Sequence, residues 1–480
     1  MKKVVYLGIL LSCMAVSCSQ QELSNDSQSI DGQIPSATLE LSGSEYLSIC
    51  FAGNNELSES EALSILEEFT SEKGVNNRTT DKQLFKLKKK TVVNSKTMAS
   101  RSTDVKEDHI TFYEFSIGDN QSASGFAVVC GDKRFPNVLA FSDEGGSEEV
   151  EPAQVMIKLA QNSAIKHISR IRHIEDSLRS TTLHKISKEM SIPVEDIDVR
   201  SLEPKIYITD EPEVESRGQQ VSPGGNLMAQ IGPLTSTKWN QDSPYNHFAD
   251  FTPQNLSEYF GDSYKGHYPA GCVVIAIAQA CAYLKPNTGL PNFNWTDAST
   301  VSFSKNDTLS SASLMVSRMV DAIAEGSGTS YSEKGGSTST ENARNFIKNW
   351  GLYMDNSTDC TFQNIKSTLD ALRLVYVTSD SRTVISSRSY VSSGRHAWLI
   401  DGYQIRQRTL TRQILKQNNV YCHCNFGWGG NSTGWYLFET SGNILFESDD
   451  VLQMDEDFNF YYEHYVYDND FKCYPNFRKG

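Results

Sequence analysis

Hydrophobic positions divide the first 208 residues into short strands and one long helix. Alternating apolar runs punctuated by Gly, Asn and Asp predict strands at Tyr46–Phe51, His109–Ile117, Gly125–Cys130 and Asn137–Phe141. Between them, the Lys- and Ser/Thr-rich section 72–107 predicts a loop. From Ile157 to Leu178, apolar residues recur at intervals of three, four and seven, which predicts a helix with one buried face and a solvated basic face.

The pattern changes after residue 226, where predicted helices come first and predicted strands follow. Helical spacing covers Cys272–Leu284, Ser311–Ala324, Thr340–Trp350 and Thr361–Leu374. Strand-type runs cover Leu374–Thr378, Ala397–Tyr403, Val420–Phe426 and Gly434–Phe438. This order predicts an α+β fold, in which helices are segregated from an antiparallel sheet. Residues 209–226, rich in Pro, Gly and Glu, predict a linker between a domain at 41–208 and a second domain at 227–480.

The N-terminus has the pattern of an export signal. Lys2 and Lys3 precede an apolar stretch that is too short to span a membrane. The stretch ends in Ala15-Val16-Ser17-Cys18, which resembles a bacterial lipobox, so residues 1–17 are interpreted as a signal peptide and Cys18 as a lipidated cysteine. Residues 18–40 would then tether the protein to a membrane surface. Ordinary signal cleavage beside an incidental cysteine is the alternative.

Composition and charge narrow the class of protein. The 480 residues carry 44 Lys plus Arg against 59 Asp plus Glu, a net charge of −15, and no basic block, so nucleic acid is not an expected partner. After the N-terminus no apolar run is long enough for a membrane span. Eight cysteines remain once Cys13 and Cys18 are set aside, and their irregular spacing in a long chain does not predict a disulfide framework.

A candidate nucleophile stands at the start of the most apolar helix. In Tyr268-Pro269-Ala270-Gly271-Cys272 a Pro/Gly turn leads into a helix, so Cys272 occupies its first turn. Free N–H groups and the helix dipole at that position favour a thiolate, the reactive form of cysteine. The alternative is that Cys272 is a small buried hydrophobic residue, as most free cysteines are.

The candidate base and its partner lie on later strands. His396 opens the predicted strand that ends at Tyr403, and Asp401 is expected to be a turn residue rather than its partner, because an odd offset points to the opposite face. Asn425 is the better candidate to orient His396, with Trp428 shielding their hydrogen bond from water. Cys422, His423 and Cys424 suggest zinc, but strand alternation places His423 on the opposite face from the cysteines, so no metal site is expected.

Together these segments resemble the streptopain family of cysteine peptidases, a branch of the papain-like clan. The resemblance covers residues 231–440 and is carried by Lys238-Trp239-Asn240-Gln241-Asp242-Ser243-Pro244-Tyr245-Asn246, Ala270-Gly271-Cys272-Val273, His396-Ala397-Trp398-Leu399-Ile400-Asp401-Gly402-Tyr403 and Asn425-Phe426-Gly427-Trp428-Gly429-Gly430. It implies a papain-like fold and four catalytic residues: Cys272 as nucleophile, His396 as acid and base, Gln241 in the oxyanion hole and Asn425 as orienting residue.

The same resemblance implies contacts with substrate at Ser339, Arg395 and Trp428. Ser339 roughly matches a substrate-contacting serine of the family, although a plain loop serine is the alternative. Arg395 stands where the family favours Gly, which puts the substrate-side wall in doubt, and Phe426 stands where it often has Trp.

Taken together, the sequence predicts an exported, lipid-anchored cysteine endopeptidase that needs no cofactor and hydrolyses protein or peptide substrates. Residues 125–143 resemble the family's propeptide, so the domain at 41–208 is expected to act as an intramolecular inhibitor. Two alternatives stay open: a Cys–His acyltransferase of the transglutaminase type, and a surface-anchored binding protein without catalysis.

Overall fold

The fold is described from a computed structural model of the chain. The described residues are 38–71, 84–95, 108–118, 124–148, 150–209, 224–254, 261–301, 309–386, 389–409, 416–440, 443–444, 451–454, 460–463 and 471–480. The expected signal peptide, Cys18, nearly all of the tether and most of the linker 209–226 lie outside them.

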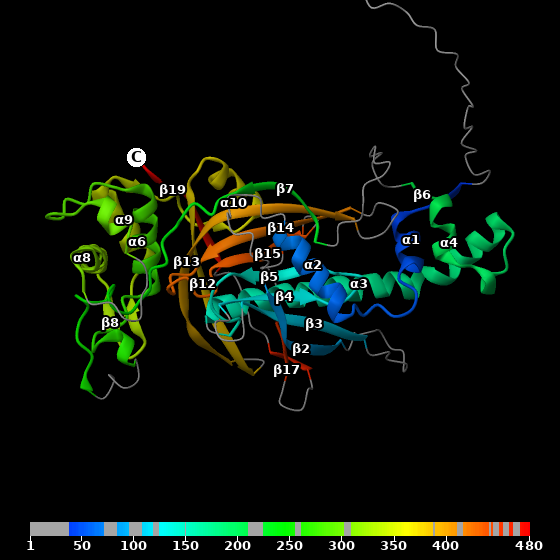
Figure 1. Cartoon of the computed structure of the whole chain (residues 1–480), viewed down its shortest axis with the longest axis horizontal. Helices are drawn as coiled ribbons and strands as arrows, with labels where there is room; N and C mark the ends of the chain where they lie inside the picture. The colour runs from blue at the N-terminus through cyan, green and yellow to red at the C-terminus, as the bar shows by residue number, and fades with distance from the viewer. Residues whose placement is uncertain are drawn as a thin grey trace, which may run out of the picture. The chain divides into compact units, whose positions relative to one another are not determined.

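One large antiparallel sheet organises the described chain (Figure 1). Its strands follow the order β10 (Leu352–Tyr353), β19 (Lys472–Lys479), β12 (Leu374–Ser386), β13 (Ser389–Thr409), β14 (Lys416–Asn425), β15 (Gly434–Thr440), β5 (Val138–Ser142), β4 (Gly125–Cys130), β3 (Asp108–Ile117) and β2 (Phe85–Ser95). Three further strands join this path: β7 (Asn226–Ile231) beside β13, β11 (Thr358–Asp359) beside β19, and β16 (Asn443–Ile444) beside β15.

Three short strand pairs lie outside this sheet. They are the parallel pair β1 (Leu39–Leu41) with β6 (Ile206–Ile208), and the antiparallel pairs β8 (Ser330–Ser332) with β9 (Gly335–Ser337) and β17 (Val451–Met454) with β18 (Phe460–Glu463).

The N-terminal and C-terminal segments meet where β5 pairs with β15. Gly434 lies opposite Ser142, and a Cβ atom at Gly434 would come within 2.1 Å of the Phe141 carbonyl oxygen, so only glycine allows this approach. The Ser142 hydroxyl donates to the Thr433 carbonyl oxygen at 2.7 Å. The sheet therefore continues through both segments.

A group of helices packs on the β12–β13 part of the sheet. It contains α6 (Cys272–Leu284), α7 (Trp295–Ala298), α8 (Ser311–Gly326) and α9 (Thr340–Ile347), while α10 (Phe362–Asp370) packs on β12, β13 and β19. From Val273 to Ala282 every residue of α6 is buried, because α6 lies between β13, α8 and α9. Its uniformly apolar sequence is what a helix enclosed on all sides requires.

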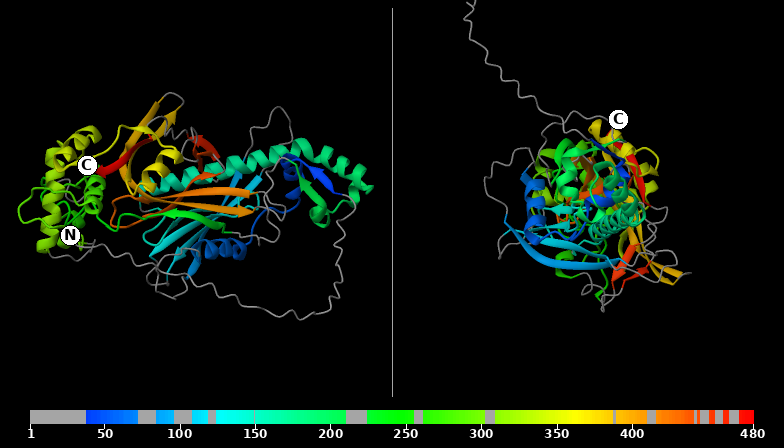
Figure 2. Two further views of the ribbon diagram at one scale, coloured as in Figure 1. Left: turned by 90° about the horizontal axis from the view of Figure 1, so that it is seen from above. Right: turned by 90° about the vertical axis from the view of Figure 1, so that its right-hand side faces the viewer.

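A second group of helices belongs to the N-terminal segment: α1 (Gly43–Cys50), α2 (Glu59–Ser71), α3 (Glu151–Met190) and α4 (Val199–Leu202). The first half of α3 packs on β4, β5 and β15, and the helix then continues to α1 (Figures 1 and 2). There Ile186 joins Tyr46, Ile49 and the strands β1 and β6 in a separate small core. Single 3₁₀ turns occupy Val194–Asp196, Glu203–Lys205, Asp262–Tyr264 and Lys348–Trp350.

The expected α+β class is confirmed, and most predicted elements are present. Cys272–Leu284 and Gly125–Cys130 have the predicted bounds, whereas the helix predicted at Ile157–Leu178 extends over Glu151–Met190. The strand predicted at Tyr46–Phe51 is wrong, because this segment belongs to helix α1. Ser42 and Glu45 form a capping box there, in which each side chain bonds the other residue's backbone N–H.

Several further elements were not predicted, among them β2 and α2. The section 72–107 was expected to be a loop, but its residues Phe85–Ser95 form strand β2 against β3. Lys at five positions in or beside this strand masked the alternation, although an edge strand tolerates lysine well. Helix α2 also went unpredicted; it buries Ala62, Ile65, Leu66 and Phe69 on one face.

One disulfide is present among the described cysteines. It joins Cys360, just before α10, to Cys473 in β19, and the two residues are 113 apart in the sequence. Cys360 directly follows β11 and Cys473 lies in β19. The two cysteines therefore meet because β11 pairs with β19 in the sheet. The irregular cysteine spacing gave no sign of this pair. None of the helices within the described residues is long and apolar enough to cross a membrane.

Candidate active site

Cys272 begins α6 at a tightly packed turn. The preceding residue, Gly271, has φ of 96°, and a Cβ atom there would lie 2.6 Å from the Gly336 carbonyl oxygen. Glycine is therefore required for the turn, and the hairpin β8–β9 is held against the loop that carries the nucleophile candidate. Because Cys272 is the first residue of the helix, its backbone N–H is not used by the helical ladder.

His396 approaches the thiol from strand β13. The Cys272 Sγ atom lies 3.7 Å from the Arg395 carbonyl oxygen, one residue before His396, and the Cys272 thiol and the His396 imidazole shift each other's pKa. The structure thus brings together the two residues that the sequence predicted as a nucleophile and a base. His396 lies opposite Ser379 of β12, and the Ser379 side chain is buried beside it.

The two groups change each other's pKa. Burial by itself would raise the pKa of the Cys272 thiol, but the hydrogen bond and positive charge of His396 outweigh burial and lower it. Burial opposes protonation of His396, yet hydrogen bonds to Cys272 and Glu151, with their negative charges, raise its pKa to about 10. At neutral pH these shifts favour a thiolate beside an imidazolium, the form in which a cysteine attacks carbonyl carbon.

Glu151, which sequence reasoning missed, also contacts this pair. It is the first residue of α3, and its Oε2 atom accepts a hydrogen bond from His396 Nε2 at 3.1 Å. A Glu at the start of a helix is common because the helix dipole favours a carboxylate there. Nothing in the sequence therefore distinguished Glu151 from an ordinary helix-start residue.

The loop between β5 and α3 carries Glu151 to this position. Ser432 donates its backbone N–H to the Glu144 carbonyl oxygen at 2.9 Å, and its hydroxyl donates to the Gly146 carbonyl oxygen at 2.9 Å. Lys238 forms an ion pair with the Glu144 carboxylate. The N-terminal segment is therefore attached to the turn that follows Asn425 and to the segment that leads to Gln241.

Gln241 is buried beside the nucleophile loop. Its carbonyl oxygen accepts the Ala270 N–H at 2.9 Å, which ties Gln241 to the turn just before Cys272. Its side chain makes no hydrogen bond in the part of the chain that the structure describes. The geometry brings the predicted oxyanion residue next to the nucleophile.

Asn425 has other partners than His396. Its Oδ1 atom accepts from Gln279 Nε2 at 3.0 Å, and its Nδ2 atom donates to Thr235 Oγ1 at 3.1 Å and to the Thr237 carbonyl oxygen at 3.0 Å. The structure does not bring the Asn425 amide to His396, whose Nε2 atom is engaged by Glu151.

The predicted substrate-contacting residues occupy three different settings. Ser339 is exposed and caps α9, where its hydroxyl accepts the Asn342 N–H at 3.4 Å. The next residue, Thr340, shares a hydrogen bond with the hydroxyl of Tyr376, which lies near the Cys272 thiol. The Arg395 side chain is exposed beside the pair, and Trp428 is half-buried against the main core.

The segment Cys422–Cys424 is structural. Both cysteines are fully buried in apolar surroundings, and burial raises the pKa of Cys424 well above its ordinary value. On the other face, His423 donates from Nδ1 to the Asp401 carboxylate at 2.5 Å. The turn expected at Asp401 is wrong: Asp401 is fully buried within β13, where it also accepts from Thr235.

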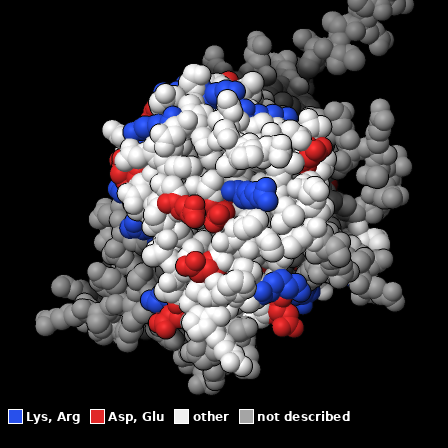
Figure 3. Space-filling model, turned by 90° about the vertical axis from the view of Figure 1, so that its left-hand side faces the viewer, with Lys and Arg blue, Asp and Glu red and all other residues white. Residues whose placement is uncertain are grey.

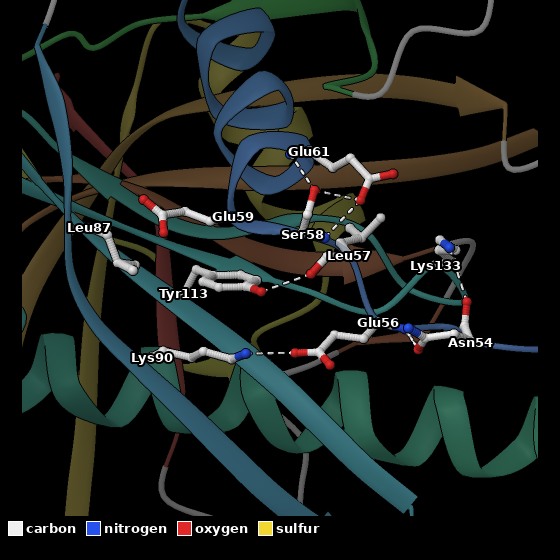
Figure 4. Close-up of a pocket in the computed structure, with 10 residues that line it drawn as sticks. All are labelled: Asn54, Glu56, Leu57, Ser58, Glu59, Glu61, Leu87, Lys90, Tyr113 and Lys133. Atoms are coloured by element: carbon white, nitrogen blue, oxygen red, sulfur yellow. Dashed lines mark hydrogen bonds and ion pairs between the residues drawn. The ribbon is translucent and has the colours of Figure 1, made fainter.

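Away from this site, the described residues show mixed surface charge and a groove. On the face shown in Figure 3 acidic and basic side chains are interspersed. A groove of about 520 Å³ lies in the N-terminal segment between α2 and the strands β2 and β3 (Figure 4). Of its charged groups, Lys90 pairs with Glu56, Lys133 donates to the Asn54 carbonyl oxygen, and Glu61 accepts from Ser58. It holds neither Cys272 nor His396.

Known proteins resemble both segments of the chain. Residues 239–436 match the model of the Peptidase C10 family, and residues 54–164 match that of the Spi protease inhibitor. Streptopains of Streptococcus pyogenes are 23% and 24% identical to this chain over 378 residues, which cover 71% of this chain and 79% of theirs.

Two solved structures from Prevotella intermedia are also similar. A fragment of prointerpain A aligns with a TM-score of 0.43 and 14% identity, covering 82% of this chain and all of the fragment. Active interpain A aligns with a TM-score of 0.31 and 18% identity, covering 44% of this chain and 87% of its own.

The matches to the two family models define a cysteine endopeptidase made as a zymogen, with an inhibitor segment in its propeptide. The segment 239–436 is a peptidase segment of the C10 type. The matched peptidase segment contains the seven predicted site residues, namely Gln241, Cys272, Ser339, Arg395, His396, Asn425 and Trp428. Glu151 lies within the matched inhibitor segment. The peptidase match supports a cysteine endopeptidase over the acyltransferase and the non-catalytic binding protein.

The pH at which Cys272 reacts tests its pairing with His396. In the latent protein, alkylation of Cys272 by iodoacetamide should reach half its maximal rate below the ordinary thiol pKa of about 8.5. In His396→Ala the midpoint should rise by more than about one pH unit, since the stabilising imidazolium is lost and burial remains. Mass spectrometry of the Cys272 peptide measures the rate, and His184→Ala, an exposed histidine on α3, is the control. An unchanged midpoint in His396→Ala would disprove the pairing.

Proposed function

We propose that Cys272 and His396 form the catalytic pair of this peptidase. The observation that carries the proposal is their meeting at the start of α6, where a lowered thiol pKa and a raised imidazole pKa favour a thiolate–imidazolium pair. The Cys272 thiolate attacks the carbonyl carbon of a peptide bond. The Gln241 amide and the Cys272 backbone N–H stabilise the oxyanion that forms.

His396 acts as an acid in the first half of the reaction and as a base in the second half. In the first half the imidazolium donates its proton to the leaving amine, and a thioester forms on Cys272. In the second half the neutral imidazole takes a proton from water as the oxygen attacks the thioester carbon; the C–S bond breaks, the acid leaves, and the thiolate–imidazolium pair is restored. Asn425 belongs to this machinery as a residue that supports the end of β14 beside the site.

Latency is attributed to Glu151. Its carboxylate holds His396 Nε2, so in the intact protein the base is bound by the propeptide and its Nε2 atom is not available to another partner. Since α3 starts at Glu151 and the β5–β15 pairing fixes the loop before it, the carboxylate is held in place by the sheet itself. Removal of the inhibitor segment would free His396.

Substrates and processing follow from the same arrangement. The substrates are proteins or peptides, bound past Ser339, Arg395 and Trp428 around the catalytic pair. The proposed domains are residues 41–208 for the inhibitor and 227–480 for the peptidase, with processing in the linker 209–226. The propeptide is the protein's own intramolecular partner.

Export and membrane attachment complete the proposal. The disulfide between Cys360 and Cys473 favours an oxidising compartment outside the cytoplasm. Residues 1–17 are proposed to direct export and Cys18 to carry the lipid that attaches the zymogen to a membrane, through the tether 18–40. Processing in the linker would separate the peptidase from that tether.

Replacement of the nucleophile should abolish activity without unfolding the protein. Cys272→Ala is expected to leave an uncut chain with no measurable hydrolysis of a fluorogenic peptide, because no other described cysteine contacts His396. The matched control is Cys281→Ala on the same helix, whose buried thiol has a raised pKa and no part in the reaction. Normal proteolysis by Cys272→Ala would refute the assignment.

Loss of the Glu151 carboxylate should weaken latency. In Glu151→Gln the pKa of His396 is expected to fall below about 10, since one of its two stabilising partners loses its charge. Initial rates of peptide hydrolysis by the uncut chain should rise several-fold. Glu148→Gln is the control, because Glu148 is exposed and lies 3.6 Å from Lys89 rather than at the site. Equal basal rates for wild type and Glu151→Gln would mean that latency does not depend on this contact.

Cys18→Ala tests the anchor. The variant should move from the membrane fraction to the soluble fraction after cell breakage, since the acyl chains attach at that cysteine alone. Immunoblotting of both fractions measures the distribution, with Cys13→Ala as the control. If Cys18→Ala stays with the membranes, the segment is an ordinary signal peptide or the attachment lies elsewhere.

A further inference from the structure

Gln279 is a buried polar residue on the helix that carries the nucleophile. It follows Cys272 by seven residues, two helical turns, and its side chain is completely buried among apolar neighbours. Both ends of its amide are bonded. Nε2 donates to Asn425 Oδ1 at 3.0 Å, and Oε1 accepts from Thr237 Oγ1 at 3.2 Å and from the Trp239 N–H at 3.3 Å. A buried amide is tolerated in such surroundings only when it is satisfied in this way.

The bonds of Gln279 are part of a longer buried chain. Asn425 donates to Thr235 Oγ1 at 3.1 Å and to the Thr237 carbonyl oxygen at 3.0 Å. Thr235 in turn donates its backbone N–H to Asp401 Oδ2 at 2.9 Å, and its hydroxyl bonds the same oxygen. Asp401 is held by His423 on its other oxygen. The polar chain therefore connects β13 and β14 to α6 across the core.

The segment between Thr235 and Trp239 is fixed by these side chains. It forms neither helix nor strand, so no regular backbone ladder determines its position. Thr235, Thr237 and Trp239, at alternate positions, each bond the polar chain. The next alternate residue is Gln241, whose carbonyl oxygen accepts the Ala270 N–H just before Cys272. The segment thus leads directly from Gln279 to the oxyanion residue.

We infer that Gln279 is a positioning residue, which fixes the segment Thr235–Trp239 on α6 and thereby sets the Gln241 amide relative to the Cys272 thiol. The inference rests on the proposed function, in which Gln241 stabilises the oxyanion. An oxyanion donor contributes about 10²–10³-fold to kcat only when its N–H meets the developing charge. Gln279 and Cys272 belong to one rigid helix. The bonds from Gln279 to the segment Thr235–Trp239 therefore hold Gln241, which follows that segment, at a fixed position relative to the Cys272 thiol.

The test separates positioning from a merely structural role. Gln279→Met keeps the side-chain length and removes all three bonds, and Thr237→Val removes one of them from the other side. The full-length variants are matured by a trace of tagged wild-type enzyme, which is then removed. For Gln279→Met we expect kcat to fall about 10²-fold, with KM within about threefold. For Thr237→Val we expect the same pattern with a smaller loss, so that the test does not depend on one variant folding.

Two readouts decide the outcome. Alkylation of Cys272 by iodoacetamide forms no oxyanion, so its rate and pH midpoint should match wild type in both variants. In a Gln241→Ala background Gln279→Met should lower kcat by less than about threefold more, since the residue it positions is already gone. Gln404→Met is the control, because Gln404 is also fully buried but bonds Gln230 and Arg406 at the far end of β13.

Each contrary result has a definite meaning. If Gln279→Met slows alkylation as much as hydrolysis, or if its effect multiplies with that of Gln241→Ala, Gln279 only supports the fold and the inference is overturned. If Gln241→Ala itself keeps wild-type kcat while Cys272→Ala is inactive, the oxyanion role of Gln241 is wrong, and the inference falls with it.

Discussion

The packing of α6 against β13 is the constraint on which the rest of this structure depends. Every residue of α6 after Cys272, as far as Ala282, is buried, so the helix can neither rotate nor slide without opening the core. That rigidity fixes a thiol at the helix start, where a dipole and free N–H groups favour its ionised form. Strand β13 then brings His396 to the same place from a segment far along the chain.

The inhibitor segment uses the same sheet to reach His396. The close approach of Gly434 to Phe141 joins β5 to β15, and the loop that follows β5 is bonded to Ser432 before α3 begins at Glu151. The position of the Glu151 carboxylate that binds His396 therefore depends on the β5–β15 pairing as well as on the sequence around Glu151.

How well each element could be predicted from the sequence depended on how many of its sides are buried. Segments buried on most sides, such as Cys272–Leu284 and Gly125–Cys130, were predicted with the observed bounds because their apolar runs are continuous. Segments with one exposed face were predicted less well. Tyr46–Phe51 is rich in strand-forming residues, yet the capping box at Ser42 and the packing of Tyr46 and Ile49 on α3 make it helical. Local propensity is a weak preference that tertiary packing overrides.

The sequence by itself determined the α+β class and the helix that starts at Cys272, because periodicity and turn residues act over a few neighbouring positions, and it singled out His396 as a candidate base. Only the tertiary structure decided which side chains meet across the sheet. The contacts that it decided are those of His396 with Glu151, of Asn425 with Gln279 and Thr235, and of Asp401 with His423, and the disulfide between Cys360 and Cys473. These pairs depend on strand order and on the register between segments far apart in the chain, and no local pattern in the sequence carries that information.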